Sequence, residues 1–258
     1  MAFDGVRVCA LNGRKIAVKI SVIVPAFNEE KLLAGTLRSI RAAAAAFAPL
    51  GWESELVVCD NNSTDRTAEL AREAAAKVVF EPVNQFGRAR NAGAAGASGD
   101  WLIFIDADSQ PSAELFADVA EAIQTGRCLA GGSTVRLEGG YPVASLVTRG
   151  WNLLSRIKKW AAGSFIFCEA AAFRETGGFS HEWYASEELE LFVRLKSMAR
   201  QRGKTITILH QHPLVTSARK MHLYTPWEHL RFLCKTVLLW GRPLRSREEC
   251  LTWYDGRR

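Results

Sequence analysis

The sequence predicts an α/β fold in which a mostly parallel sheet is flanked by helices. Short, continuous apolar runs bounded by turn residues recur along the chain, which is typical of strands buried on both faces of a parallel sheet. Stretches rich in Ala, Leu, Glu and Arg lie between these runs and predict helices. The 258 residues are 48% hydrophobic and 23% charged, which suffices for one substantial core and excludes extended disorder and fibrous repeats.

The first half of the chain alternates strand and helix. Its apolar runs predict strands at residues 20–25, 55–60, 77–80 and 101–106. The intervening stretches predict helices at residues 29–48, 65–76 and 88–97. This βαβ alternation indicates that about residues 19–110 form the nucleotide-binding half of the domain.

The second half, about 111–225, is less regular. Its expected elements are a helix at 112–125, strand and turn over 129–143, a strand at 163–168, a short helix in 171–179, a helix from 187 to about 200 and a strand at 205–209. From Pro226 onward an amphipathic helix and tail are expected, up to residue 258. We interpret residues 1–258 as a single domain with two halves.

Charge, cysteines and apolar segments restrict the functional class. Thirty-three Lys and Arg against 27 Asp and Glu give a net charge of +6, which suits phosphates or acidic lipid head groups but does not indicate nucleic acid. The six cysteines lack CxxC or CxxH spacing, which favours buried reduced thiols over a disulfide frame or zinc site. Because no signal-peptide core and no run of roughly 18 apolar residues occurs, we expect a cytoplasmic protein.

The strongest chemical signal is Asp106-Ala107-Asp108, directly after the fourth strand. Two carboxylates one residue apart at the carboxyl end of a buried parallel strand project into the crevice where α/β sheets bind ligands. Hard oxygen ligands there suit Mg²⁺ or Mn²⁺ carrying a diphosphate. The structural alternative is that Asp108 or Ser109 caps the helix entered through Pro111.

Polar loops also follow the first three strands, in the segments 25–30, 60–65 and 84–91. Together with the Asp106–Asp108 motif, their order over roughly residues 19–195 resembles the family 2 glycosyltransferases of the GT-A fold. The resemblance implies a GT-A-like, Rossmann-type sheet with an acceptor-side C-terminal half. It also implies metal-dependent transfer of a sugar, by inverting displacement, from a nucleotide-diphosphate sugar to a hydroxyl acceptor such as a saccharide, a lipid or a small molecule.

The resemblance assigns roles by position. It places Pro25, Ala26 and Glu29 around the base and ribose, Asp60 near the base, Arg88 at the diphosphate, Asp106 at the ribose and Asp108 on the metal. Each position also has an ordinary interpretation. Asn28 and Glu29 would cap a first helical turn, residues 60–65 would form a turn and helix cap, and Arg88 would be a solvated helix residue.

A glutamate pair is the candidate catalytic base. In the family a Glu-Asp pair opens a helix after a Gly-Gly-Phe turn; here Gly177-Gly178-Phe179 is present, but Glu188 stands where Asp is usual. Either Glu188 or Glu187 would then deprotonate the acceptor. The alternative is that both are first-turn acids of a helix capped by Ser186, in which Glu190 and Arg194 form an i,i+4 pair.

Several other residues have two interpretations. The spacing of His210, His212 and His222 favours ordinary surface or core histidines over metal ligands, whereas Arg219 and Lys220 suit a departing diphosphate. Aromatic side chains would form either sugar-stacking surfaces or core; these are Trp151, Trp160, Trp183 and Tyr184. The C-terminal stretch from Pro226 is open to peripheral contact with the inner face of a membrane, or to packing on the domain or on a homodimer partner.

Other enzyme classes lack their motifs. No GxGxxG follows the first strand, and neither GxxxxGK[ST] nor GxSxG occurs, which removes the dinucleotide-binding, P-loop and α/β-hydrolase classes. Two alternatives to a glycosyltransferase remain at this stage. One is a nucleotidyl- or phosphotransferase that uses the same metal crevice, and the other is a non-catalytic nucleotide-sugar-binding module.

Overall fold

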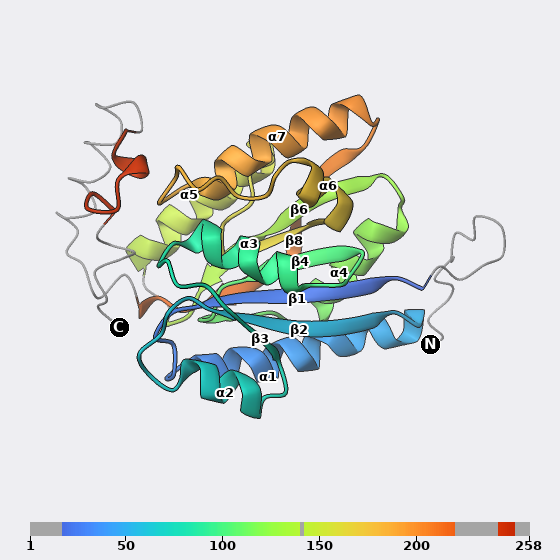
Figure 1. Cartoon of the computed structure of the whole chain (residues 1–258). Coiled ribbons are helices and arrows are strands. Elements are labelled where there is room, and N and C mark those ends of the chain that lie inside the picture. Colours follow the sequence, from blue (N-terminus) through green and yellow to red (C-terminus); the bar gives the residue numbers. More distant parts are fainter. Residues whose placement is uncertain (1–16, 140–141, 220–241, 251–258) are drawn as a thin grey trace.

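The computed structural model describes residues 17–139, 142–219 and 242–250 (Figure 1). Its strands are β1 (Lys19–Ala26), β2 (Glu53–Asp60), β3 (Lys77–Phe80), β4 (Trp101–Ile105), β5 (Ser109–Gln110), β6 (Cys128–Leu137), β7 (Phe165–Glu169) and β8 (Thr205–Thr216). Its helices are α1 (Leu33–Ala44), α2 (Thr67–Glu73), α3 (Phe86–Gly96), α4 (Ala113–Gln124), α5 (Pro142–Lys158), α6 (Ala170–Glu175) and α7 (Glu187–Gln201), with 3₁₀ turns η1 (Ala45–Leu50) and η2 (Arg242–Arg245).

These strands form one sheet in the order β3-β2-β1-β4-β7-β6-β8-β5. Strands β1 to β4 are parallel, β7 runs antiparallel between β4 and β6, and β8 is parallel to β6. The register pairs Ala26 with Asp60, so β1 and β2 end side by side. The predicted α/β class, with a mostly parallel sheet flanked by helices, is confirmed.

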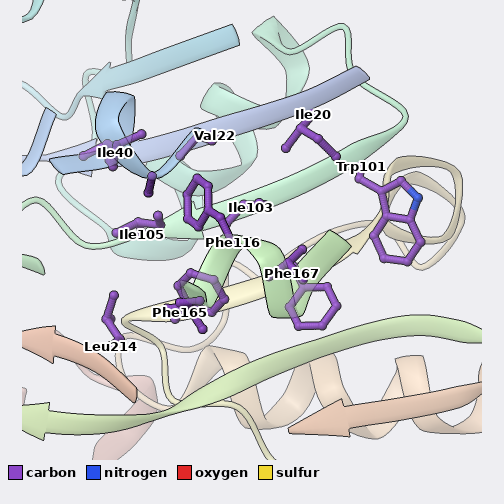
Figure 2. Close-up of a cluster of buried hydrophobic side chains, with 14 of the residues drawn as sticks. Ile20, Val22, Ile40, Trp101, Ile103, Ile105, Phe116, Phe165, Phe167 and Leu214 are labelled. Atoms are coloured by element: carbon purple, nitrogen blue, oxygen red, sulfur yellow. The ribbon is translucent and has the colours of Figure 1, made fainter. Parts of the chain in front are cut away.

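Alternate residues of the central strands enter two different cores. Val22 of β1 and Ile103 of β4 lie in the core under α1 and α4, which Figure 2 shows with Phe116 at its centre. Their neighbours Ile23 and Leu102 lie in the opposite core, beneath α3, α6 and α7. Because both faces are buried, the strands read as continuous apolar runs rather than as alternating patterns.

The second half differs from the prediction in two elements. Strand β8 continues to Thr216 instead of ending at 209, which carries the chain on to the carboxyl edge of the sheet. Helix α5 was not predicted, although Leu146, Leu153 and Ile157 recur at helical spacing. In the first half, helix α1 begins only at Leu33, and the end of the expected helix is a 3₁₀ turn.

The cysteine prediction is confirmed for the four residues that the structure describes. Cys59, Cys128, Cys168 and Cys250 are buried free thiols. Burial raises the pKa of Cys59 to about 12, so its thiolate is suppressed at neutral pH. Cys9 and Cys234 lie outside the described residues.

Among the residues that the structure describes, no helix has the length and apolar character needed to cross a bilayer. The amphipathic helix expected from Pro226 falls mostly in residues 220–241, outside the described residues.

Candidate active site

The loops after β1 and β2 are fastened to each other at the carboxyl edge of the sheet. Asn28 has a left-handed backbone (φ 53°), and its Oδ1 accepts the amide of Thr64 at 2.8 Å. Its own amide donates to Oγ of Ser63 at 3.0 Å. The amide of Glu29 donates to Oγ1 of Thr67 at 2.8 Å. The first turn of α1 therefore receives no side-chain cap from Asn28 or Glu29, contrary to the capping alternative.

The loop after β3 is held by the loop after β2. Asn61 donates through Nδ2 to the carbonyl of Glu81 at 3.0 Å, and its Oδ1 accepts the amide of Gln85 at 3.0 Å. Asp60 is buried and accepts the amide of Ser63 at 3.0 Å. Hydrogen bonds thus join the loops after β1, β2 and β3 into one rim around the strand ends.

A pocket opens inside this rim. Its lining residues are Pro25, Phe27, Glu29, Phe86, Asp106, Ala107 and Asp108. The structure therefore brings together four of the predicted site residues, from two loops some 80 positions apart. Ala26 is instead a core residue, whose carbonyl accepts the amide of Asn61 at 2.8 Å.

Arg219, three residues after the end of β8, lies beside two carboxylates that line this pocket. Its Nη2 lies 2.8 Å and 2.9 Å from the two carboxylate oxygens of Glu29. The same atom lies 4.0 Å from Oδ2 of Asp108, whose carbonyl accepts the amide of Ser217. Nε of Arg219 is buried and has no hydrogen-bond partner among the described residues. This orphaned donor suits an anionic ligand beside Asp108. Lys220 lies outside the described residues.

Asp106 and Asp108 have the chemistry of a partial metal site. Neither Asp108 nor Ser109 caps α4, since Ser112 does so by accepting the amide of Leu115 at 3.2 Å. Within the described ranges no three His, Cys, Asp or Glu side chains gather at one point. Two carboxylates still fit Mg²⁺ or Mn²⁺, because such ions commonly take one or two protein carboxylates and complete their shell with waters and substrate phosphates.

Arg90 of α3 links this aspartate motif to the glutamate pair. Its Nη2 donates to Oδ1 of Asp106 and to the carbonyl of Gly163, both at 3.0 Å, and its Nη1 pairs with Glu187. The guanidinium lies 5.3 Å from the ring centroid of Phe179. Burial opposes the charge of Arg90, but Asp106 and Glu187 outweigh it and raise the pKa of Arg90 above its ordinary value.

Replacing Arg90 by Lys should lower the free energy of unfolding by about 2 kcal/mol, because an ammonium group cannot reproduce the buried fork of charged hydrogen bonds. Urea denaturation measures this. Arg88→Lys is the control, since Arg88 is partly exposed and donates through Nε to Gln85 at 3.2 Å. Equal losses in the two variants would contradict the assigned role of Arg90.

The two glutamates open α7 in different environments. Ser186 has a left-handed backbone (φ 62°) and its side chain makes no capping hydrogen bond, so the Ser cap of the structural alternative is absent. The expected pair of Glu190 and Arg194 is confirmed, with Nη2 and Oε2 2.5 Å apart. Glu187 is buried and paired with Arg90, whereas no cation among the described residues forms an ion pair with Glu188.

Both carboxyls of this pair have a raised pKa. Burial, together with repulsion from Glu187, raises the pKa of Glu188 to about 8, although Arg90 acts in the opposite direction. Burial also raises the pKa of Glu187. The carboxyl of Glu188 lies beside Gly163, where an added Cβ would come within 3.6 Å of its Oε2. A half-buried carboxyl with a pKa near 8 is typical of a general base.

Asn91 of α3 and Gln85, which directly precedes α3, position the loop that leads to α7. Asn91 donates to the carbonyl of Phe179 at 2.8 Å and accepts its amide at 2.9 Å. Gln85 donates through Nε2 to the carbonyls of His181 and Trp183, at 2.8 Å and 3.0 Å. In this segment the sequence predicted Arg88 as a site residue, and the roles of Gln85, Arg90 and Asn91 were not predicted. Arg88 is not among the residues that line the pocket.

The Gly177-Gly178 turn offers a matched pair of variants. Both residues have positive φ, but an added Cβ would meet nothing at Gly177 and would lie 2.5 Å from Oδ1 of Asn91 at Gly178. Gly177→Ala should therefore cost only about 1 kcal/mol of backbone strain, and Gly178→Ala about 2–3 kcal/mol. Thermal unfolding checks the order, and a Gly177→Ala variant at least as unstable as Gly178→Ala would contradict it.

Other predicted residues lie away from the pocket. Nδ1 of His212 lies 3.0 Å from Oδ2 of Asp118 on α4, and His222 falls outside the described residues. Cations stack on two of the candidate aromatic side chains. The Arg245 guanidinium lies 4.7 Å from the ring centroid of Trp183, and Nζ of Lys196 lies 5.3 Å from that of Trp160.

An α/β sheet covered by helices on both faces, with an acidic pocket where its parallel strands end, is typical of α/β proteins that bind ligands in the crevice at the strand ends. The sequence matches the profile of Glycosyl transferase family 2 over residues 21–176, which is more than half of the chain. The chain therefore belongs to glycosyltransferase family 2, and the resemblance seen in the sequence is confirmed.

Curated relatives match only in part. A dolichol-phosphate mannosyltransferase of Pyrococcus furiosus is 33% identical over 153 residues, which are 54% of this chain and 41% of that protein. An undecaprenyl-phosphate 4-deoxy-4-formamido-L-arabinose transferase of Edwardsiella ictaluri is 35% identical over 114 residues, 42% of this chain and 34% of that protein. The matched segments thus span well under half of these relatives.

Solved structures agree in fold. A mannosyltransferase from Pyrobaculum calidifontis, in complex with GDP-Man and Mn²⁺, has a TM-score of 0.62 at 20% identity and covers 84% of this chain and 61% of its own. Glucosyl-3-phosphoglycerate synthase from Mycobacterium tuberculosis, in complex with Mn²⁺, UDP and phosphoglyceric acid, has a TM-score of 0.57 at 22% identity and covers 86% of this chain and 76% of its own.

Proposed function

We propose that this chain transfers a sugar from a nucleotide-diphosphate sugar to a hydroxyl acceptor, with the help of Mg²⁺ or Mn²⁺ and with inversion at the anomeric carbon. One observation carries the proposal. Arg90 joins Asp106, in the pocket wall, to Glu187, next to the titratable Glu188. A donor held in the pocket would thus lie close to a base that serves the acceptor.

The donor half of the proposal rests on the rim and the pocket. Pro25, Glu29 and Asp60 would hold the base and ribose, with Ala26 setting the path of the strand end. Arg219 would lie against the diphosphate, because its buried Nε is an unused donor. The nucleotide complexes of the two structural neighbours support a nucleotide-sugar donor.

Asp108, with Asp106, would hold the divalent ion. When bound, such an ion stabilises negative charge on a leaving diphosphate. The Mn²⁺ in both neighbouring complexes supports this choice.

The acceptor chemistry belongs to the glutamate pair. As the acceptor oxygen forms its bond to the anomeric carbon, Glu188 takes the hydroxyl proton, and the bond between that carbon and the diphosphate oxygen breaks. The electron pair of the broken bond leaves with the nucleoside diphosphate. Glu187, fixed by Arg90, keeps the first turn of α7 in place and adds the repulsion that raises the pKa of Glu188.

A donor screen tests this function. The melting temperature is measured with UDP- and GDP-sugars, with and without Mn²⁺; a ligand at about a hundred times its Kd adds about 2.7 kcal/mol, or roughly 5 °C or more. A nucleotidyl- or phosphotransferase would respond to a nucleoside triphosphate irrespective of any sugar. A binding module would be stabilised by a donor without ever releasing nucleoside diphosphate in the presence of acceptor alcohols.

A further inference from the structure

The side of helix α5 that packs on the domain is small and polar apart from Trp151, and the helix turns five Leu, Ile and Val side chains to solvent. Asn152 accepts the amide of Val135 on β6 at 3.0 Å and donates to its carbonyl at 2.8 Å. Ala144 and Ser155 are buried on the same side. This is the reverse of the usual arrangement, in which the apolar stripe of a surface helix faces the core.

The exposed side of α5 is a continuous apolar stripe. Leu146, Val147, Leu153 and Ile157 are each between 59% and 70% exposed, and Leu154 is 39% exposed. At 100° per residue these side chains fall within one third of the helix circumference, and Gly150 lies in the middle of them. Among the described residues this stripe accounts for five of the eight large apolar side chains that are exposed.

Cations flank the stripe on both sides. Arg149 and Arg156 lie along one edge of it, and Lys158 lies along the other. Between Glu138 and Glu169 the sequence contains four Lys and Arg but no Asp or Glu. The positive charge extends onto α7, where burial and the nearby Arg200, Lys158 and Lys159 lower the pKa of Lys196.

We propose that the apolar stripe of α5 docks on an anionic membrane surface, with α5 lying in the plane of the interface. An apolar stripe bordered by Lys and Arg is the pattern of helices that bury one side at the level of lipid head groups. The stripe would enter the acyl boundary while Arg149, Arg156 and Lys158 contact lipid phosphates.

The positive charge along the stripe disfavours two other partners for it, a second copy of the chain and residues 220–241. A second copy docked through the same stripe would place its cations against those of the first copy. Residues 220–241 of this chain also carry net positive charge, with Lys220, Arg231 and Lys235 against Glu228. An anionic bilayer complements the stripe in both charge and hydrophobicity.

Docking through α5 would bring the candidate active site close to the bilayer. The turn that follows α5 supplies the carbonyl of Gly163 to Arg90 and the carbonyl of Ser164 to the amide of Asp106. Only a few residues thus separate the end of α5 from the pocket wall.

Vesicle flotation of the full chain tests the proposal without any measurement of activity. The wild type should float with vesicles containing phosphatidylglycerol at low salt, and less with phosphatidylcholine alone or at high salt. Leu153→Asn with Ile157→Asn should weaken flotation by about tenfold or more, because the apolar contact is lost. Phe80→Asn should float like the wild type, since Phe80 is also 59% exposed but lies on β3, five strands away from β6.

A variant that removes positive charge tests the proposal independently of the variant that removes apolar side chains. Arg149→Gln with Arg156→Gln should weaken binding by about tenfold and reduce its salt dependence. The proposal is overturned if the wild type does not float with phosphatidylglycerol vesicles at low salt, or if the Leu153/Ile157 variant floats as well as the wild type. It is also overturned if that variant loses several degrees of melting temperature or dissociates a dimer, since the stripe is then covered by protein.

Discussion

Replacing Glu188 by Gln should lower kcat by on the order of 10²–10⁴-fold while donor affinity stays near the wild-type value. The amide keeps the shape of the carboxyl but cannot accept the acceptor proton in the transition state. Donor affinity should survive because Glu188 does not line the pocket that holds Glu29 and Asp108. Steady-state kinetics together with donor titration separate the two effects.

Glu187→Gln is the matched control. Because Glu187 is buried and paired with Arg90, its replacement should act mainly on stability and only secondarily on kcat. If Glu187→Gln is inactive and Glu188→Gln has nearly wild-type activity, the general base is Glu187 and not Glu188. Full activity in both variants would leave the glutamates with a structural role alone.

The pH profile gives the same prediction a second readout. A base must be deprotonated to act, so with the pKa of Glu188 at about 8, kcat/KM should rise with pH and reach half of its maximum near pH 8. This limb should vanish in Glu188→Gln. A wild-type profile that is flat between pH 6 and 9 would contradict the assignment.

Stability should change with pH in the opposite sense. A carboxyl whose pKa is raised by folding favours the folded state when it is protonated, so its contribution is present below the unfolded value of 4.5 and is lost as pH rises through about 8. Glu188→Gln should therefore gain stability over the wild type at pH 9 relative to pH 4.5, by on the order of 1–2 kcal/mol after allowance for partial exposure.

Replacing Asp108 by Asn should abolish the Mn²⁺-dependent part of donor affinity, a loss of about a hundredfold or more. The amide keeps one oxygen but loses the charge that holds a divalent ion. The fold should persist, because Arg219 retains its contacts with Glu29. Titration of UDP and GDP with and without Mn²⁺ measures the effect.

Asp118→Asn controls for the loss of one negative charge, since Asp118 sits on α4 beside His212 and does not line the pocket. It should leave the metal-dependent affinity unchanged. An Asp108→Asn variant that retains the full Mn²⁺ effect would remove Asp108 from the metal site.

The sequence could predict the first half of the fold because its central strands, β1 and β4, are buried on both faces. Continuous apolar runs such as residues 101–105 have few alternatives when turn residues bound them. Helix α5 was missed although its apolar residues have helical spacing, and the direction in which it faces could not be predicted from the sequence. Sequence patterns assume that apolar side chains face the core, and α5 presents them to solvent instead.

The candidate site was predictable where strand ends determine it. Glu29, Asp106 and Asp108 follow neighbouring parallel strands, so the sheet alone brings them together. Arg90 was not predictable in this way. Arg88 and Arg90 share one helix, and only the packing of Gly163 and Glu187 against α3 selects Arg90 for burial. The different environments of Glu187 and Glu188 likewise depend on this tertiary contact.

The pairing of Glu29 with Arg219 bears on where this domain can be cut. The family match ends at residue 176, yet Arg219 and strand β8, which pairs with β5 and β6, lie beyond that point. A fragment trimmed to the match would lack Arg219, which pairs with the carboxylate of Glu29. A minimal unit for expression, or for grafting into another enzyme, must therefore extend past Arg219.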